Sequence, residues 1–276
     1  MSVQSKHISS GWRSFLAYRA RRLTGIQTGL AALDRILLGL SGIVVIQGAP
    51  GCNKSTLALQ FASYQASSGN PVLIVDRENG KERFRTRLLC QANRIDQVHA
   101  FTCSESELKG YVDRVRSWPI YVETDPVREV ALLKAMLDEM AVAHPGRPLL
   151  LVVDSLQALP ALDAEERLSL QLWLKELDQL KLDYDGRLTI VATSEKRRGE
   201  AGIEYDRASL GAGKGAGAIE YKAEMVLDLR RRKDDGNIVC EVVKNRDGLS
   251  GTSVDLRPML ADPKNSQSFC FRLEAA

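Results

Sequence analysis

The sequence is poor in the residues that build metal sites and disulfide frameworks. Its five cysteines are scattered, odd in number and without a C-x-x-C pair. Its three histidines, His7, His99 and His144, lie far apart along the chain. Zinc sites need regularly spaced ligands, and unpaired cysteines are typical of proteins in reducing compartments. The sequence therefore argues against a zinc site or a disulfide framework.

Long apolar stretches are missing as well. The run at residues 149–153 is much shorter than the roughly 20 apolar residues of a membrane-spanning helix. The first residues include Lys6, Trp12, Arg13 and Arg19, and they lack the apolar core and the small-residue cleavage site of a secretory signal. We therefore expect a cytoplasmic protein that does not interact with membranes.

The composition is that of a globular protein with an uneven charge distribution. The 276 residues are 44% hydrophobic and 26% charged, which fits one large α/β domain with short extensions or two small domains. The net charge is +3, of which residues 1–25 contribute +5 and the remainder +3 − 5 = −2. Such a basic arm can contact nucleic acid or an acidic neighbouring subunit, and a solvated helix face is an equal alternative.

Short apolar runs alternate with helical patterns over the first two-thirds of the chain. Because strands that alternate with helices form parallel sheets, the order predicts an α/β fold in which helices cover both faces of a parallel sheet. We expect strands at residues 43–47, 72–75, 120–122, 149–153 and 188–192, and helices at residues 8–23, 30–38, 55–68, 82–92, 127–143 and 168–182.

The pattern changes after residue 220. Strands are expected at residues 225–229, 238–244 and 253–256, and the turns Asp235-Gly236 and Asp247-Gly248 predict antiparallel hairpins. The basic run at residues 230–233 is interpreted as a solvated hairpin rim or a subunit contact. Residues 195–218 are polar and glycine-rich, and a loop of this length in a compact domain is usually functional.

A loop with the features of a triphosphate site connects the first expected strand to the next helix. Triphosphate binding needs backbone N–H groups turned toward the anion, residues without bulk, and a helix N-terminus. In this loop Lys54 would reach the β- and γ-phosphates, and the Ser55 hydroxyl would hold Mg²⁺. The predicted ligands are ATP and Mg²⁺, and the loop comprises Gly48, Ala49, Pro50, Gly51, Cys52, Asn53, Lys54, Ser55 and Thr56.

Two acidic positions at strand ends complete the predicted nucleotide site. Asp154 follows the apolar strand at residues 149–153 and would hold Mg²⁺ through water. Glu78 follows the second strand, where it could orient the water that attacks the γ-phosphate. Asp76 is the competitor for that role, with a helix cap or a strand-end salt bridge as its alternative function.

These motifs resemble those of RecA-like ATPases, and among them the DnaB-type replicative helicase motor and the related RadA and KaiC-like proteins. The likeness covers about residues 25–256. It rests on the segments Thr24-Gly25-Ile26-Gln27-Thr28-Gly29-Leu30, Asp154-Ser155-Leu156-Gln157, Gly217-Ala218-Ile219-Glu220 and Lys244-Asn245-Arg246-Asp247-Gly248, and on Glu78 with Arg87 nine residues later.

The resemblance implies a ring or filament, with a hexamer expected, and ATP sites between subunits. It implies that Glu78 activates water, that Arg87 belongs to the nucleotide site, and that Lys244 and Arg246 act on the γ-phosphate of the neighbouring subunit. An exposed pair of cations at a strand end, without such a role, is the alternative for Lys244 and Arg246. We expect residues 1–24 to form a helical arm and residues 25–276 the motor, without the collar domain of bacterial DnaB helicases.

The sequence departs from the family pattern at two positions. Asn53 replaces the glycine that normally precedes the lysine, and asparagine is the best non-glycine substitute at positive φ. Glu195 stands where the family usually has a glutamine that senses the γ-phosphate. A carboxylate there would repel a triphosphate unless a cation or a proton compensates it.

The resemblance also implies a channel for single-stranded DNA. Its loops would be residues 157–167 and 196–217, and a polar loop without a ligand is the alternative for the second. The predicted DNA-binding residues are Lys196, Arg197, Arg198 and Lys214. Three functions stay open: a DNA-translocating helicase motor, a RadA-like strand-handling or loader ATPase, and a KaiC-like regulatory ATPase that acts on protein. Replication or repair proteins are expected partners of the first two.

Overall fold

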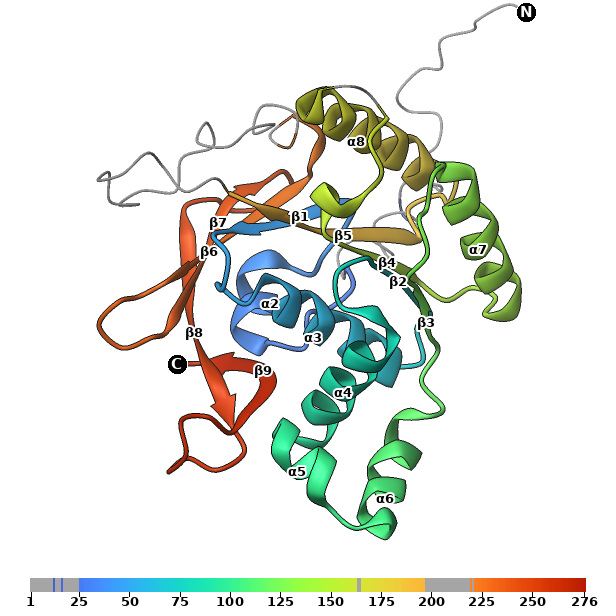
Figure 1. The fold of residues 1–276 in the computed structure, drawn as a ribbon. Helices are drawn as coiled ribbons and strands as arrows, with labels where there is room; N and C mark the ends of the chain where they lie inside the picture. Colours follow the sequence, from blue (N-terminus) through green and yellow to red (C-terminus); the bar gives the residue numbers. More distant parts are fainter. Residues whose placement is uncertain (1–11, 13–15, 17–24, 163–164, 197–218, 220) are drawn as a thin grey trace, which may run out of the picture.

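A single mixed sheet organises the protein. The computed structural model describes residues 12, 16, 25–162, 165–196, 219 and 221–276 (Figure 1). Its nine strands follow the order β3-β2-β4-β5-β1-β6-β7-β8-β9. They are β1 (Ile43–Gly48), β2 (Val72–Asp76), β3 (Ile120–Glu123), β4 (Leu149–Asp154), β5 (Leu188–Glu195), β6 (Met225–Arg231), β7 (Ile238–Asn245), β8 (Thr252–Leu260) and β9 (Phe269–Ala275).

The sheet is parallel from β3 to β6 and antiparallel beyond β6. The central strand β1 is buried along its whole length, as expected for a strand that helices cover on both faces. The predicted parallel core and the predicted hairpins on both sides of β7 are therefore confirmed. The helices are α2 (Ala31–Leu37), α3 (Lys54–Ser67), α4 (Gly80–Asn93), α5 (Gln97–Thr102), α6 (Glu105–Val115), α7 (Val130–Ala143) and α8 (Glu166–Leu182).

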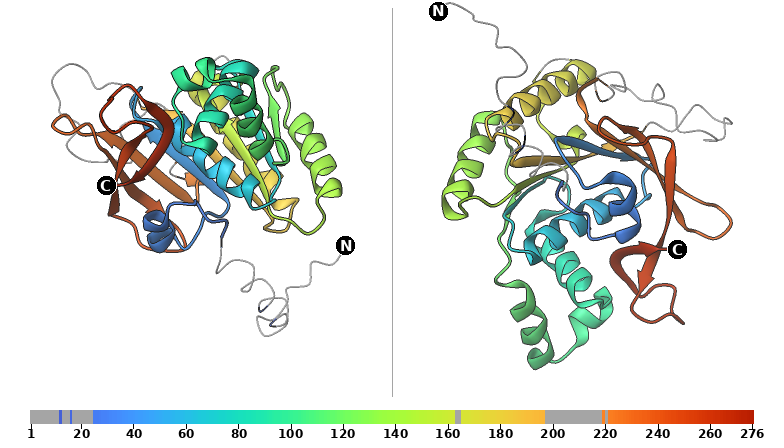
Figure 2. Two further views of the ribbon diagram at one scale, coloured as in Figure 1. Left: turned by 90° about the horizontal axis from the view of Figure 1, so that it is seen from below. Right: turned by 180° about the vertical axis from the view of Figure 1, so that it is seen from behind.

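Alternate residues of β1 point into two separate hydrophobic cores. Val44 and Ile46 pack in the core that Phe61 of α3 also enters. Val45 packs on the opposite face, in the core that contains Leu137 of α7 and Trp173 of α8. The helix layers on the two faces of the sheet are visible in Figure 2. The period-two alternation of buried residues along β1 thus decides which helix each strand residue meets.

Helices α5 and α6 and strand β9 are absent from the sequence-based prediction. Helix α6 begins with a capping box in which Ser104 and Glu107 each bond the other's backbone N–H, and this pattern is readable in the sequence. Helices α5 and α6 lie at the opposite end of the molecule from α8 (Figure 1). The expected helix at residues 8–23 lies outside the described residues except for Trp12 and Leu16, which are helical. None of the described helices has both the length and the apolar character of a membrane span.

Strand β9 is held to the body of the protein by a buried glutamine of α3. The Gln60 Nε2 donates to the Leu273 carbonyl at 2.9 Å, and the Leu273 N–H donates to Gln60 Oε1 at 2.8 Å. The side-chain amide therefore pairs both backbone groups of one residue of β9, as a neighbouring strand would.

We predict that Gln60→Leu lowers the free energy of unfolding by about 1–3 kcal/mol, because both Leu273 groups lose their partner in a buried place. Urea denaturation measures the change. Gln267, which is exposed on the loop before β9, supplies the matched control Gln267→Leu. Equal stability of the two variants would show that β9 does not depend on this amide.

Candidate functional site

The candidate site lies where the parallel strands end. Gly48 at the end of β1 pairs in register with Glu195 of β5, and Asp76 of β2 pairs with Asp154 of β4. The carboxyl ends of parallel strands meet at one edge of a sheet, which is where ligands bind in open α/β folds. The four strand ends are therefore brought together although they come from distant parts of the chain.

The loop between β1 and α3 has the backbone shape of an anion-binding loop. Gly51 and Asn53 have φ values of 81° and 63°, so both are left-handed. Asn53 thus adopts the conformation that was expected of it as a replacement for glycine. Gly48 is needed for a different reason, because a Cβ there would lie 2.5 Å from the Leu229 carbonyl oxygen. Helix α3 begins at Lys54, so its N-terminus points into the loop.

Lys54 is folded back onto this loop. Its ammonium group donates to the Gly48 and Ala49 carbonyl oxygens at 3.0 and 3.1 Å, and the residue is buried. These two carbonyls keep the Lys54 ammonium group at the loop, where a phosphate group could replace them as its partner.

A serine hydroxyl and a carboxylate form the candidate Mg²⁺ position. The Ser55 Oγ donates to Asp154 Oδ1 at 3.0 Å, and the Thr193 Oγ1 donates to the same oxygen at 2.6 Å. Burial raises the pKa of Asp154, its two hydrogen bonds oppose that shift, and the nearby Asp76 and Glu78 charges add to it. Hydroxyl and carboxylate oxygens suit Mg²⁺, and a cation would relieve this crowding of negative charge.

Mg²⁺ would need further ligands at this position. Within residues 25–162, 165–196, 219 and 221–276, no three Asp, Glu, His or Cys side chains group to hold a metal ion. The donor set therefore fits Mg²⁺ that also carries water and substrate phosphates, which is the usual arrangement for this ion.

The geometry separates the two candidate bases. The bonds of the Asp76 carboxylate are structural, because it accepts from the backbone N–H groups of Glu78 and Asn79 at 3.0 Å and from the Asn79 side chain. Glu78 accepts a bond at its Oε1, from the Ser155 hydroxyl at 3.1 Å. Asp76 thus shapes the turn before α4, and Glu78 is the carboxylate that this turn presents toward Asp154.

Arg87 and Glu195 are the remaining predicted site residues near Asp154. Arg87 lines a small cavity together with Ser55, Asp76 and Asp154, and its guanidinium stacks 5.6 Å from the Phe271 ring centroid. Glu195 is exposed, and its backbone N–H donates to the Gln157 side-chain oxygen at 3.3 Å.

Four residues near the site have no assigned role in the sequence-based prediction. Thr193 and Ser155 each donate a hydroxyl to an acidic site residue, and Gln157 links the ends of β4 and β5 through Ser194. Arg231 donates to the Gly51 carbonyl at 3.2 Å, so this member of the basic run faces the phosphate loop and not only the rim of a hairpin. Ser155 and Gln157 have a sequence signal, because both belong to the motif around Asp154.

The structure gives Lys196, which was predicted to bind DNA, a partner inside the protein. Its side chain is 10% exposed, and its ammonium forms an ion pair of 2.9 Å with Asp228, which is 2% exposed. Burial raises the pKa of Asp228 although Lys196 opposes that shift, so the carboxylate depends on this cation. The charge of Lys196 therefore already has an internal partner, Asp228. Arg197, Arg198 and Lys214 lie outside the described residues.

Lys244 and Arg246 lie at the opposite end of the sheet from the phosphate loop. Asn245 between them pairs with Met225, and Met225 pairs with Val44 near the start of β1. Lys244 donates to the Ala223 carbonyl at 2.6 Å, and Arg246 donates to the Tyr221 carbonyl at 3.1 Å. About four residues of strand, on the order of 13 Å, separate this position from Gly48.

Comparison of the sequence with known proteins identifies relatives of this chain. The family model of the DnaB-like helicase C-terminal domain matches residues 25–262. The DNA repair protein RadA of Mycolicibacterium smegmatis is 32% identical over 114 residues, which are 39% of this chain and 24% of that protein. The replicative DNA helicase DnaB of Treponema pallidum is 26% identical over 243 residues, 83% of this chain and 53% of that protein. The chain thus spans about a quarter to a half of these relatives.

Two solved structures have the same fold. One is a separately solved ATPase domain, which superposes with a TM-score of 0.84 at 19% identity, over 99% of this chain and 100% of that one. The other is a DnaB-like replicative helicase, solved in a study of its interactions with primase. It superposes with a TM-score of 0.82 at 18% identity, over 98% of this chain and 67% of that one.

The left-handed backbone at Asn53 generates a prediction about the phosphate loop. We expect Asn53→Gly to preserve or raise ATP hydrolysis, because glycine adopts this conformation without strain. Asn53→Val should cost about 1–2 kcal/mol of backbone strain and weaken ATP binding. Nucleotide titration and steady-state hydrolysis measure both effects. A large loss of ATP affinity in Asn53→Gly would instead show that the asparagine side chain contacts the nucleotide.

Proposed function

The chain belongs to the DnaB-like helicase C-terminal domain family, and from this we propose that it is an ATP-hydrolysing, ring-forming motor that acts on single-stranded DNA. The observation that carries the proposal is the 3.0 Å bond from Ser55 to Asp154 beside Glu78, at the edge where the phosphate loop ends β1. The family match begins at residue 25, which supports a motor of residues 25–276 and an arm of residues 1–24.

We assign the chemistry of hydrolysis to four residues. Lys54 leaves the two loop carbonyls and binds the β- and γ-phosphates, which the N–H groups of the loop also surround. Ser55 and Asp154 would hold Mg²⁺, which would supply positive charge for the phosphates. Glu78 orients the attacking water, and the Ser155 hydroxyl keeps one of its oxygens in place.

Glu195 and two cations that contact the phosphate loop belong to the same proposal. The carboxylate of Glu195 disfavours a triphosphate, so it needs positive charge nearby. Arg231 bonds the phosphate loop at Gly51, and Lys54 lies at the other end of the same loop. We propose that these two cations offset Glu195, and that Arg87 supports the site from the side of α4.

The position of Lys244 and Arg246 supports sites shared between subunits. Both side chains lie too far along the sheet to reach the phosphate loop of their own subunit. A cation that a neighbouring subunit supplies stabilises charge that develops in the transition state, and it couples hydrolysis to subunit movement. We therefore assign Lys244 and Arg246 to the site of the adjacent subunit in a hexameric ring.

The DNA contact is assigned to the segment after β5. Arg197, Arg198 and Lys214 would bind the phosphates of a single strand without reading its sequence, as in other single-strand-binding channels. Lys196 is left out because of its ion pair with Asp228. Replication or repair proteins are the partners that such a motor would serve.

A strand-handling or loader ATPase is the second candidate. It is favoured by the likeness to RadA, which at 32% is higher in identity than the likeness to DnaB but covers only 39% of the chain. A strand-displacement assay separates the two functions, because only a helicase motor unwinds a duplex with the energy of ATP hydrolysis.

The first test concerns ATP hydrolysis. We expect Lys54→Ala to abolish hydrolysis and weaken triphosphate binding, because the cation at the phosphates is lost. Glu78→Gln should still bind ATP but hydrolyse it on the order of 10²-fold more slowly, because the positioned base is lost. Asp76→Asn serves as the comparison. If Glu78→Gln has a normal kcat and Asp76→Asn does not, the base is Asp76.

The second test concerns single-stranded DNA. We expect the combined change of Arg197, Arg198 and Lys214 to alanine to weaken DNA binding, and to reduce the log–log salt slope by about 0.7 per lost phosphate contact. Fluorescence anisotropy over a salt series measures both quantities. The control replaces three exposed arginines on other elements, Arg85, Arg116 and Arg257. Unchanged affinity and slope, or no DNA binding by the wild type with an ATP analogue, would remove the DNA assignment.

A further inference from the structure

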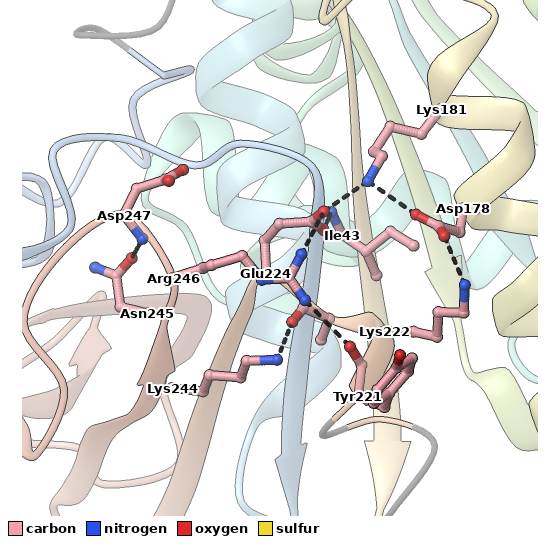
Figure 3. A network of polar contacts seen from close by, with 11 residues as sticks. Ile43, Asp178, Lys181, Tyr221, Lys222, Glu224, Lys244, Asn245, Arg246 and Asp247 are labelled. Atoms are coloured by element: carbon pink, nitrogen blue, oxygen red, sulfur yellow. Dashed lines mark hydrogen bonds and ion pairs between the residues drawn. The ribbon is translucent and has the colours of Figure 1, made fainter. Parts of the chain in front are cut away.

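Glu224, just before β6, connects the start of β1 with the segment that carries Arg246. Its backbone N–H donates to the Ile43 carbonyl at 2.9 Å, and the Ile43 N–H donates to its Oε2 at 2.7 Å. Gly42 permits this approach, because a Cβ there would lie 2.6 Å from the Glu224 carboxylate. Figure 3 shows Glu224 at the centre of a polar network. One residue therefore occupies both backbone groups of the first residue of β1.

The same carboxylate is paired with a lysine of α8. The Lys181 ammonium lies 2.6 Å from Glu224 Oε1 and 2.9 Å from Asp178, whose other oxygen binds Lys222 at 2.8 Å. Burial by itself lowers the pKa of Lys181, but its hydrogen bonds to Glu224 and Asp178 raise that pKa above the usual value. The lysine is therefore a firmly charged partner that compensates Glu224 from the side of α8.

Two backbone carbonyls just before β6 hold the two cations assigned to the neighbouring site, and a third holds the backbone of Arg246. The Tyr221 carbonyl accepts from the Arg246 guanidinium, and the Ala223 carbonyl accepts from Lys244. The Glu224 carbonyl accepts from the backbone N–H of Arg246 at 2.9 Å. The Arg246 guanidinium also lies 3.8 Å from Glu224 Oε1, beyond hydrogen-bond distance. Arg246 is thus oriented by residues 221–224 while its ion pair with Glu224 stays loose.

Among the described residues, the ion pairs of Asp178 and Glu224 do not cancel in charge. Lys181, Lys222 and Arg246 are three cations, and Asp178 and Glu224 are two anions, which leaves a surplus of +1. The side chains of Lys181 and Glu224 are 12% and 14% exposed, whereas that of Arg246 is 52% exposed. The surplus positive charge is therefore presented to solvent by Arg246, where an external anion can meet it.

We propose that Glu224 is a positioning residue for Arg246, and that Lys181 neutralises Glu224 so that Arg246 is aimed outward without being neutralised itself. This inference rests on the proposed function, in which Arg246 acts on the nucleotide of the adjacent subunit. Glu224 also bonds Ile43, the first residue of β1, and β1 ends at the phosphate loop of the same subunit. Glu224 therefore connects Arg246 with the strand that carries this loop.

The proposal predicts that loss of Glu224 and loss of Lys181 act on Arg246 in different ways. Without the Glu224 charge, the contacts of its side chain with Ile43 and Lys181 weaken, and the carbonyls of Tyr221 and Glu224 that orient Arg246 are no longer fixed. Without Lys181, the whole Glu224 charge turns to Arg246 and withholds it from a phosphate. Both single changes should therefore slow hydrolysis in the assembled protein, and removal of the Glu224 charge should partly rescue the loss of Lys181.

The test measures kcat and nucleotide affinity of the assembled protein. We expect Glu224→Gln and Lys181→Met each to lower kcat on the order of tenfold, because a misaligned group loses its effect on the transition state steeply. ATP affinity should be unchanged, and Lys181→Met combined with Glu224→Gln should be faster than Lys181→Met alone. Glu274→Gln, which breaks the Arg257–Glu274 pair between β8 and β9, is the matched control and should behave as the wild type.

Mixed assemblies decide whether Glu224 acts on the neighbouring site or on its own. Lys54→Ala subunits cannot hydrolyse ATP but keep Arg246 in place. Added to Glu224→Gln subunits, they should raise hydrolysis per Glu224→Gln subunit several-fold, because intact arginines then face intact phosphate loops. If Glu224→Gln instead damages its own loop through Ile43, mixing gives no gain and the proposal is overturned.

A reference mixture separates this inference from the function on which it rests. Arg246→Ala subunits mixed with Lys54→Ala subunits should also regain hydrolysis. If that mixture regains activity and the Glu224→Gln mixture does not, only the positioning role of Glu224 fails. If the reference mixture shows no gain, the assignment of Arg246 to the adjacent site fails, and the inference fails with it. A wild-type kcat for Lys181→Met would also overturn the proposal, independently of how well Glu224→Gln folds.

Discussion

The hydrogen bond from the Ser55 hydroxyl to the Asp154 carboxylate joins the two halves of the proposed nucleotide site, which are 99 residues apart in sequence. It exists because β4 ends beside the helix that begins at Lys54, and because both strand and helix are fixed by their buried faces. Other site residues are arranged around it: the Thr193 hydroxyl donates to the same Asp154 oxygen, and the Ser155 hydroxyl donates to Glu78. The site is therefore a property of the edge of the sheet, and it exists only while the strands are in register.

The charged side chains near the two ends of β1 are balanced in different ways. At the phosphate end, Asp76, Glu78 and Asp154 come close together, and burial raises the pKa of Asp154, so the site is suited to a cation. At the other end, Glu224 is compensated by Lys181 and a positive charge is left over on Arg246. One end of β1 thus suits Mg²⁺, and the other end presents a cation that can meet an anion. This is the complementarity that the proposed ring of identical subunits needs.

Much of the fold and of the site is predictable from local pattern. The strands of the parallel core, the phosphate loop and the acid that ends β4 carry strong signals, because buried parallel strands are continuous apolar runs and the loop needs small residues in a set order. Helices α5 and α6 were not predicted, although the Ser104–Glu107 capping box marks the start of α6. Strand β9 carries no comparable signal, because it depends on its pairing with β8 and on Gln60, which is 213 residues from Leu273 in sequence.

The sequence by itself determined the chemistry of the site: a phosphate loop with Asn53 in place of glycine, an acid after each of two strands, and a paired lysine and arginine near the end of β7. Only the tertiary structure decided which of these side chains have partners inside the protein and which can meet a ligand. It engaged Asp76 in a turn, buried Lys196 against Asp228, placed Arg231 on the phosphate loop, and set Arg246 at the far end of the sheet. The reason is physical: residue type sets what a side chain can donate or accept, but its partner and its exposure depend on strand order and register.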